Sequence, residues 1–541
     1  PAGPRPVPVS GRVDPERFAA AHGGRLVAWE ALGEHAGDRC DTRVDAFEAS
    51  IDERHAWATR TVAATDRCDR PVSVVVGDPG DIPTAASTDV RSEPTVAAAV
   101  ASAPPNTTVF VPPGTYDVDR IILNRSVTLA GAGDGAATET GETASDAEGA
   151  NDANATTLRG DGNGSVIVLR AAGAAVSDLR VAGVGRIGSR GDERRNESAD
   201  WDTSVQLAYG YGDAGVVLDG AAGASVTHVG IDTPASGVIV RESPRSVLAN
   251  LRVRGADTAS EGFMGVVLIG APSVVEESTF RGGRDGVYTH RADGSVVRDN
   301  DVEPGRYGVH EMYTSSSLVA NNTVHDAQAG VIVMTRPVDN LVVGNDIRDG
   351  TYGIVPAGSE SYYARNVVVG GEYGLGVAGD RNVFVGNVIA DTHVGVRANE
   401  ILPSNRVVRN DVVGNERAVV ATLGPLRTWS HRGRGNHWGR LPITDHDGDG
   451  IYDRPYRPSG AVDSRIGTSA GATTLAQSPA AMVLRRVQDT VSGLRQSGVV
   501  DTAARTDPVR PRVVEAVRNH TAPANRTTPA PEPTHAGGGS A

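Results

Sequence analysis

The chain contains no lysine, so all 52 of its basic residues are arginine, and 66 acidic residues outnumber them. The formal net charge is −14, and an acidic chain without a basic stripe argues against a nucleic-acid partner. An acidic excess without lysine indicates a halophilic source with a GC-rich genome. Aromatic residues are scarce, at 4%, whereas the 66 glycines are typical of a chain with many turns.

Long apolar runs and cysteines are also rare. No apolar run reaches the roughly 18 residues that a membrane-spanning helix needs. The chain begins at Pro1, so we expect a leader to have been removed and any membrane anchor to lie outside this chain. The two cysteines, Cys40 and Cys68, flank a helix-like run. A disulfide between them would place the protein in an oxidising compartment, the periplasm or cell surface, and two buried free thiols are the alternative.

A short phrase recurs along the chain: a small residue, Gly and an apolar pair, then about a dozen residues that end in Asn–x–Val/Ile. Successive repeat glycines are 21 to 28 residues apart, a period that indicates a solenoid. The apolar runs are too short for helices. The sequence therefore predicts an all-β fold, a right-handed single-stranded parallel β-helix of about ten coils with small helical N- and C-terminal elements. The glycines are Gly215, Gly237, Gly265, Gly286, Gly308, Gly330, Gly353, Gly374 and Gly395.

The alternation within each repeat predicts which side chains face inward. Residues one and three past the glycine are mostly Val, Leu or Ile, as at Val331 and Val333. Because side chains on a strand alternate between faces, these should fill the core. Residues two and four past the glycine should then point to solvent, and we expect any chemistry on these outer columns because the inside is packed.

Composition shifts divide the chain into six parts. Residues 1–82 lack the repeat and look mixed, with a helical segment near 44–64, and 83–132 should hold a capping helix and the first strands. Residues 133–157 have almost no large apolar side chain and are predicted to be a disordered acidic insertion. The regular coils run over 158–435. A calcium-loop and helix region follows at 436–502, and 503–541 is expected to be a flexible linker tail.

One outer column carries soft metal ligands. Four residues past their glycines stand His290, Met312 and Met334, in three successive repeats, and His310 lies in the adjacent column. Neighbouring coils are about 4.8 Å apart, so these side chains should stack. Imidazole and thioether together favour Cu(I) over Mg²⁺, Ca²⁺ or Mn²⁺. The alternative is that a long loop covers this face and that the methionines are ordinary packing.

Charged residues adjoin this column. Arg284 and Arg306 each stand two residues before a repeat glycine, Asp285 follows Arg284, and Glu311 occupies an inward position. An arginine ladder that supports the coil turns is one interpretation. A catalytic set in an outer groove, with Arg284 or Arg306 as base and Asp285 and Glu311 as the carboxylate cluster, is the other.

The segment DHDGDGIYD places Asp445, Asp447, Asp449 and Asp453 around a sharp bend at Gly450. Alternating carboxylates with a glycine at the bend form the first half of a calcium-binding loop. The bidentate Glu of a complete EF-hand loop is absent, since Tyr456 stands there. We predict a structural Ca²⁺ site.

These motifs together resemble the NosD family. The segment RYGVHEMYTSS, which includes Arg306, Tyr307 and His310, is followed one repeat later by GVIVM, and VPPGTY, NHWG, DHDGDGIYDRPY and SPA occur in the family's order. The resemblance covers about 90–497. It implies an extracytoplasmic, non-enzymatic accessory protein that works with an ABC transporter complex and supports assembly of the copper–sulfur centre of nitrous oxide reductase, handling copper transiently. His310, Met312 and Met334 match the family's motif.

Three functions are therefore open. The leading one is a copper-handling maturation factor for denitrification. The second is a carbohydrate-active enzyme of the calcium-dependent polysaccharide lyase type, and the third is a non-catalytic cell-surface protein. The metal content of the purified protein would separate the first from the others, and release of unsaturated sugars from uronate polymers would establish the second.

Overall fold

The structure, a computed structural model, describes residues 29–66, 70–77, 90–133, 155–189, 208–260, 262–400, 404–421, 426–441, 443–458, 478–480, 483 and 498–521. The chain divides into two compact units, Pro1–Trp57 and Ala58–Ala541. Helix α2 (Trp29–Thr65) supplies all described residues of the first unit and begins the second. It is longer than the helix predicted near 44–64. No helix among the described residues has both the length and the apolarity to cross a membrane.

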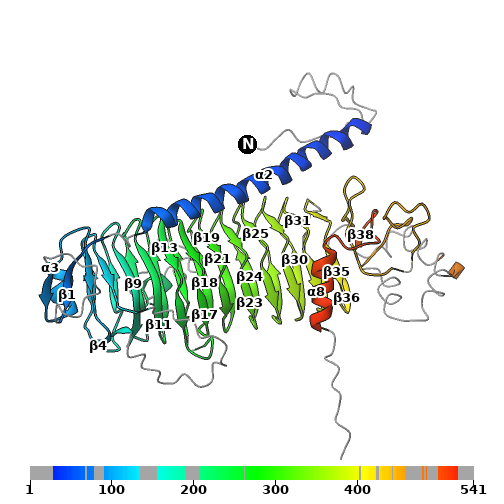
Figure 1. The fold of residues 1–541 in the computed structure, drawn as a ribbon. Helices are drawn as coiled ribbons and strands as arrows, with labels where there is room; N and C mark the ends of the chain where they lie inside the picture. The colour runs from blue at the N-terminus through cyan, green and yellow to red at the C-terminus, as the bar shows by residue number, and fades with distance from the viewer. Residues whose placement is uncertain are drawn as a thin grey trace, which may run out of the picture. The chain divides into compact units, whose positions relative to one another are not determined.

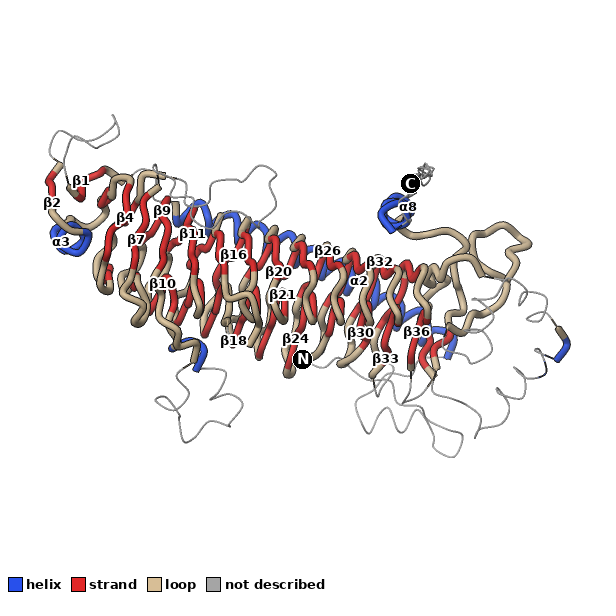
Figure 2. The backbone as a smooth tube through the Cα atoms, turned by 90° about the horizontal axis from the view of Figure 1, so that it is seen from below, coloured by secondary structure: helices blue, strands red, loops and turns tan. Residues whose placement is uncertain are grey.

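The second unit is a right-handed parallel β-helix, in which the strands of the described residues pair in parallel and successive coils stack along one axis (Figures 1 and 2). Each regular coil contributes one strand to a twelve-stranded sheet, two more than the predicted number of about ten. Beyond the nine glycine repeats, two strands of this sheet precede the first repeat glycine and one follows the last. The strands of this sheet are β5 (Ile121–Leu123), β8 (Ile167–Leu169), β10 (Ala214–Asp219), β12 (Ser236–Arg241), β15 (Val266–Ile269), β18 (Asp285–His290), β21 (Tyr307–Met312), β24 (Ala329–Met334), β27 (Tyr352–Val355), β30 (Tyr373–Val377), β33 (Val394–Ala398) and β36 (Arg417–Val420).

The remaining strands of the coils form a second, 24-stranded sheet with two parallel rows that join at two long strands, β9 (Ala175–Ala182) and β11 (Ser225–Asp232). The first row contains β1 (Val72–Val76), β2 (Arg91–Glu93), β3 (Thr108–Phe110), β6 (Thr128–Ala130), β13 (Ser246–Ala249), β16 (Ser273–Glu276), β19 (Val296–Arg298), β22 (Leu318–Ala320), β25 (Leu341–Val343), β28 (Tyr362–Ala364), β31 (Val383–Val385) and β34 (Arg406–Val408). The second row contains β4 (Gly114–Asp117), β7 (Thr156–Arg159), β14 (Arg252–Arg254), β17 (Thr279–Arg281), β20 (Asp301–Glu303), β23 (Thr323–His325), β26 (Asp346–Arg348), β29 (Val367–Val369), β32 (Val388–Ala390) and β35 (Asp411–Val413).

The inward residues fill one continuous core, as the alternation predicted. Val309 and Val331 are fully buried and pair with each other across adjacent coils. The core begins at α3 (Val96–Ser102), where Thr95 caps the helix by accepting a hydrogen bond from the Ala98 amide at 3.2 Å. Val96, Ala99 and Val100 of this helix belong to the same core cluster as the coils, so α3 closes the open end of the stack.

The repeat glycines are required by close approach between coils. A Cβ at Gly308 would lie 2.5 Å from the carbonyl oxygen of Gly330 and 2.6 Å from a methyl of Val324, and the other repeat glycines have contacts of the same kind. The φ angle of Gly308 is not positive, so its backbone conformation does not require glycine. The missing side chain therefore lets the neighbouring coil and the core side chains approach the strand closely. The conformational freedom of glycine is not the reason that it recurs in each repeat.

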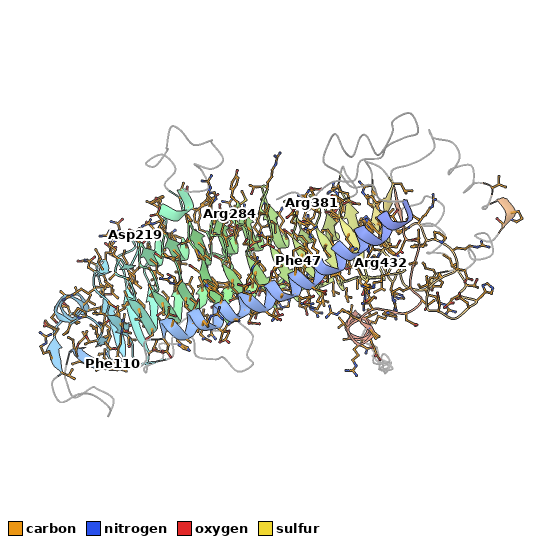
Figure 3. All side chains as sticks on the ribbon, turned by 90° about the horizontal axis from the view of Figure 1, so that it is seen from above. Phe47, Phe110, Asp219, Arg284, Arg381 and Arg432 are labelled. Carbon is orange, nitrogen blue, oxygen red and sulfur yellow. The ribbon has the colours of Figure 1, made fainter. Side chains whose placement is uncertain are left out.

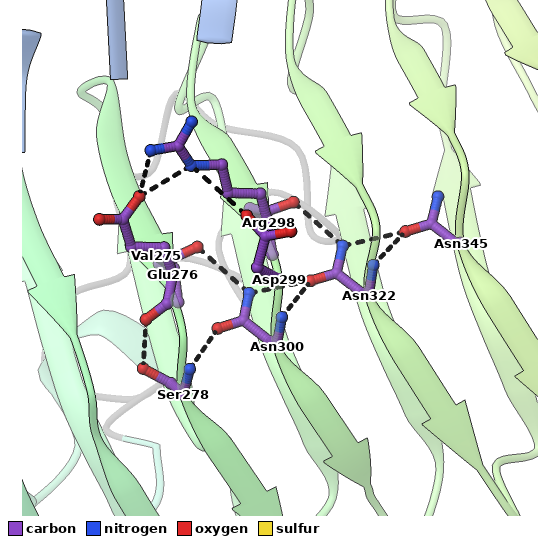
Figure 4. A network of polar contacts seen from close by, with 9 residues as sticks. Val275, Glu276, Ser278, Arg298, Asp299, Asn300, Asn322 and Asn345 are labelled. Carbon is purple, nitrogen blue, oxygen red and sulfur yellow. Dashed lines mark hydrogen bonds and ion pairs between the residues drawn. The ribbon is translucent and has the colours of Figure 1, made fainter. Parts of the chain in front are cut away.

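The Asn of each repeat forms a buried ladder at a corner of the coils. The Asn322 side-chain amide donates to Oδ1 of Asn345 at 3.0 Å and to the carbonyl of Val297 at 3.0 Å, and Asn300 repeats the first contact with Asn322 (Figure 4). The ladder continues through Asn366, Asn387, Asn410 and Asn436. Each Asn side chain provides hydrogen-bond partners for main-chain groups at the corner, where the chain leaves the sheets. Buried main-chain groups need such partners because an unpaired one is costly.

The C-terminal part differs from the predicted linker, which was placed at 503–541. Residues 498–521 form β38 (Val499–Val500), which pairs with β37 (Arg427–Thr428), and helix α8 (Pro511–Thr521). Val514 and Val517 of α8 pack against a cluster that includes Val388, and Asp411 accepts hydrogen bonds from the Val509 and Arg510 amides just before the helix. The spacing of the two valines places them on one helix face. The surrounding Pro, Thr and Arg residues made the segment look like a linker, so this helix was not predicted from the sequence. The helix predicted after Ser478 and the insertion at 133–157 lie largely outside the described residues.

Candidate functional site

The predicted outer column lies on the twelve-stranded sheet. His290, Met312 and Met334 are in register at the ends of β18, β21 and β24, and His310 occupies the column beside them, next to Tyr288 and Ile332. The period of the repeat produces this register, because each strand starts at the same distance from its glycine. The sequence therefore placed these side chains correctly on the outer face.

The outer face is not open to solvent along its whole length, and this corrects the prediction for His290, Met312 and His310. Tyr288 and Met312 belong to an apolar cluster on the outside of the coils, which Tyr209, Phe263 and Tyr313 cover. His290 is fully buried, and its ring meets the Tyr313 ring edge to face at 5.5 Å. The packing alternative therefore describes Met312. Met334 differs, because 39% of it is exposed.

His310 and Met334 meet at the boundary between the covered and the open face. His310 Nε2 lies 3.3 Å from the Met334 sulfur. On the other side of the ring, Nδ1 lies 2.9 Å from Oδ2 of Asp285, which belongs to the preceding coil. The rings of Tyr288 and Tyr307 flank the imidazole edge to face, each with its centroid 5.0 Å away. The imidazole is thus held on four sides.

Asp285 is the charged centre of this arrangement. Its carboxylate has no exposed surface, and it accepts a hydrogen bond from Arg306 Nε at 2.7 Å as well as the contact with His310. Burial acts to raise the pKa of Asp285, but the hydrogen bonds from His310 and Arg306 outweigh it and lower the pKa below its ordinary value. Burial acts to lower the pKa of Arg306, yet its hydrogen bond to Asp285 raises it overall. The carboxylate and guanidinium therefore form an ion pair.

The two arginines do not form the predicted ladder. Arg306 turns to Asp285, whereas Arg284 donates from Nη1 to the Tyr209 hydroxyl at 3.3 Å and lies over the Tyr209 ring. Figure 3 places Arg284 and Asp219 along one side of the stack. The main chains of the two arginines are neighbours, since the Arg306 amide donates to the Arg284 carbonyl, but their side chains diverge. Local partners on each coil decide the direction of each guanidinium.

The proposed catalytic set is also not assembled. Glu311 is fully buried inside the coil, as its inward position predicted, and its Oε2 accepts a hydrogen bond from the Asn340 amide at 3.0 Å. Asp285 is buried on the outside and engaged by Arg306 and His310. The two carboxylates therefore lie on opposite faces of the sheet and do not share an open groove.

His290 is a buried imidazole of a different kind. Its Nε2 has no hydrogen-bond partner among the described residues, and its Nδ1 lies 3.5 Å from the Tyr288 hydroxyl. Burial, aided by the charge of Arg291, lowers the pKa of His290 to about 4. Burial likewise raises the pKa of the Tyr288 hydroxyl. His290 is therefore neutral near pH 7, and a neutral imidazole is the form that binds a metal.

The donor atoms of His310 and Met334 fit a soft cation. When the imidazole is neutral and donates from Nδ1 to the Asp285 carboxylate, Nε2 carries a lone pair. A thioether sulfur has only lone pairs. In this tautomer two acceptors face each other at 3.3 Å. Nitrogen and sulfur ligands of one tetrahedral metal ion lie about 3.5 Å apart, from bond lengths of about 2.0 and 2.3 Å. A Cu(I) ion would satisfy both atoms.

Three of the four aspartates of the predicted calcium loop converge. One carboxylate oxygen from each of Asp445, Asp447 and Asp453 lies within 4.8 Å of the others. Asp449 is outside this group, and its Oδ1 accepts a hydrogen bond from the Ile451 amide at 2.8 Å. Asp445 accepts from the Gly448 and Gly450 amides, so main-chain donors fix its orientation.

The predicted disulfide lies outside the described residues, because Cys68 and the side chain of Cys40 belong to parts of the chain that the structure does not describe.

Comparison with known proteins gives two family matches. Residues 257–442 match the family model described as periplasmic copper-binding protein (NosD). Residues 257–442 therefore belong to the NosD family. This NosD segment, as we call residues 257–442, contains β18, β21 and β24 with His310 and Met334. Residues 86–332 match a second model, described as rhamnogalacturonase A/epimerase, pectate lyase-like.

Two curated relatives carry the name probable ABC transporter binding protein NosD. The relative from Pseudomonas aeruginosa is 33% identical over 113 residues, which is 21% of this chain and 26% of that protein. The relative from Stutzerimonas stutzeri is 31% identical over 109 residues, 20% of this chain and 25% of that protein. The chain thus matches about a quarter of the length of each NosD relative.

Among solved structures, an exopolygalacturonase from Thermotoga maritima is similar with a TM-score of 0.34 and 12% identity, over 56% of this chain and 84% of that one. A likeness of this degree says nothing about the chemistry of this chain.

Proposed function

We propose that this chain is a non-catalytic, extracytoplasmic copper-handling protein that holds Cu(I) between His310 and Met334. The observation that carries the proposal is the approach of His310 Nε2 to the Met334 sulfur at 3.3 Å, while Nδ1 of the same ring is engaged by Asp285. Imidazole and thioether are ligands that favour Cu(I). The periplasmic copper-binding description of the NosD family supports the location and the metal.

The exposure of Met334 suits transfer better than storage. An ion between His310 and Met334 would be reached from solvent at the thioether, which is 39% exposed. His290 and Met312 form the less accessible half of the predicted ligand set, under Tyr313 and the other covering rings. We therefore place the entry position at Met334, and His290 and Met312 in a deeper position beside it.

The finer part of the proposal concerns partners. The relatives are named as ABC transporter binding proteins, which supports association of this chain with an ABC transporter complex. We propose that copper handled in this way serves assembly of the copper–sulfur centre of nitrous oxide reductase. Cu(I) is then the cargo of the protein and is released to a partner.

Anaerobic Cu(I) titration against a chelator of known affinity tests the site. Met334→Leu conserves volume, so folding should change little, whereas Cu(I) affinity should fall by about tenfold or more, equivalent to about 1.4 kcal/mol. His310→Ala should have an effect at least as large. Met264→Leu is the matched control, since Met264 is buried outside the ligand column and should leave affinity unchanged.

The titration also has outcomes that reject the assignment. If the protein with both His310→Ala and Met334→Leu binds Cu(I) as tightly as the parent, copper is held elsewhere. If Met312→Leu alone weakens binding more than Met334→Leu, the ion sits in the deeper position beside His290.

We propose that Asp445, Asp447 and Asp453 bind a structural Ca²⁺. Chelation should lower the thermal midpoint of the C-terminal region, because a ligand present at 100 times its Kd stabilises the folded state by about 2.7 kcal/mol. Asp447→Ala should abolish the response to Ca²⁺. Asp449→Ala should preserve it, because Asp449 lies outside the converging group. Equal responses of the two variants, or no calorimetric signal on addition of Ca²⁺ to the parent, would reject the Ca²⁺ site and leave the loop as an ordinary turn.

A further inference from the structure

One buried carboxylate, Asp285, links two side chains of the next coil. Asp285 stands at the start of β18, and both of its partners, Arg306 and His310, come from the next coil. It is the only charged residue among the positions that directly precede the nine repeat glycines, where the others are small, apolar or tyrosine. A charge at a fully buried position is costly unless it is paired, so its presence requires an account.

We propose that Asp285, anchored by Arg306, is the positioning residue that turns the lone pair of His310 Nε2 toward Met334. The inference rests on the proposed Cu(I) site. It assigns a role to Asp285 and Arg306, neither of which would contact the metal. Both nitrogens of the His310 ring have a defined neighbour, Asp285 at Nδ1 and Met334 at Nε2.

The role follows from the two nitrogens of the ring. A neutral imidazole carries its proton on one nitrogen only, and the hydrogen bond of that nitrogen selects which one remains free to bind a metal. The Asp285 carboxylate accepts from Nδ1 at 2.9 Å, so the free lone pair is on Nε2, the atom 3.3 Å from the Met334 sulfur. Without Asp285 the proton could move to Nε2, where it would block the position between nitrogen and sulfur.

Arg306 holds the Asp285 carboxylate in place. Its guanidinium remains protonated and forms a two-point contact with the carboxylate, through Nε at 2.7 Å and through the terminal nitrogen. The guanidinium balances the charge of the Asp285 carboxylate, which also accepts from His310 Nδ1. Outer-sphere carboxylates of this kind fix ligand histidines, and their loss costs 10- to 100-fold in metal affinity.

Asp285→Asn tests the proposal in the full-length chain by Cu(I) competition titration. We expect its Cu(I) affinity to fall about 10- to 100-fold. A second variant with Asp285→Ala and Arg306→Met removes both charges, avoids an unpaired guanidinium and should lose affinity to the same extent. Glu276→Gln is the matched control, because it breaks another largely buried carboxylate–arginine pair, that of Glu276 with Arg298 at 2.6 Å (Figure 4). Glu276 lies on β16 of the 24-stranded sheet, whereas the site lies on the twelve-stranded sheet.

A double-mutant cycle separates positioning from general destabilisation. If Asp285 acts through His310, Asp285→Asn should have no further effect on Cu(I) affinity in a His310→Ala background. Two-bond proton–nitrogen NMR of the metal-free protein, with His310 assigned by difference against His310→Ala, should show the proton on Nδ1 in the parent. In Asp285→Asn the proton should redistribute toward Nε2.

The outcomes distinguish this inference from the proposed function. If the parent binds Cu(I) and His310→Ala weakens binding, but Asp285→Asn binds like Glu276→Gln, the positioning role is wrong and the site stands. An unchanged tautomer in Asp285→Asn also overturns it. If the parent does not bind Cu(I), or His310→Ala binds normally, the proposed function fails and this inference fails with it.

Discussion

Val331→Asp should lower the free energy of unfolding by roughly 4 kcal/mol or more, enough to remove the cooperative melting transition of the central coils. Val331 is fully buried in the middle of β24 and pairs with Val309 and Ile354 on either side. A carboxylate there has apolar neighbours in the core and cannot reach water without leaving the strand. Because each coil is packed against the next, the defect should extend to the coils of β21 and β27.

Val338→Asp is the matched control, since Val338 is in the following turn and 45% exposed. Its free energy of unfolding should stay within about 0.5 kcal/mol of the parent. Chemical denaturation monitored by circular dichroism measures both variants. Equal stability of Val331→Asp and the parent would mean that the inward and outward faces of the strand are exchanged.

Repetition made the fold predictable from sequence. A period near 22 residues fixes the coil, and the two-residue alternation after each glycine fixes which side chains enter the core, as at Val309 and Val331. The same spacing from the repeat glycine predicted that His290, Met312 and Met334 stand in one column. Features that repeat in phase are determined by the backbone of the coil, so single-sequence reasoning reaches them.

Features that occur once were not predictable in the same way. The cover over His290 and Met312 comes from Tyr209 and Phe263, which lie outside the repeat phrase, in segments between coils. Nothing in the period says where such segments fold. Exposure was therefore predicted wrongly for the buried members of the column, although their direction was correct.

The contacts of Asp285 were missed for another reason. Sequence columns compare equivalent positions, whereas Asp285 and His310 stand at different positions of neighbouring repeats and meet diagonally. The rotamers of both side chains decide such a contact. A usable signal existed in the sequence, because Asp285 is the only charge in its column.

In cells that make nitrous oxide reductase, a chain with His310→Ala, Met312→Leu and Met334→Leu should leave the copper-centre content and activity of the reductase close to those of a strain without this protein. The three changes remove both thioethers of the column and the His310 imidazole beside it, while the two leucines conserve the volume of the methionines. Met312 is packed in the outer apolar cluster, and leucine can replace it there. Copper content and activity of the purified reductase measure the effect, with immunoblots to confirm equal amounts of the variant.

Met264→Leu again provides the control, because it alters a buried methionine of the same outer cluster outside the ligand column. Normal reductase in the triple variant would reject the assignment of these side chains, whatever the titration of the purified protein shows. Loss of reductase copper together with retained Cu(I) binding would instead move the role of the column from metal binding to contact with a partner. The β-helix stands in either case, because it depends on the inward valines and repeat glycines, and none of these is changed.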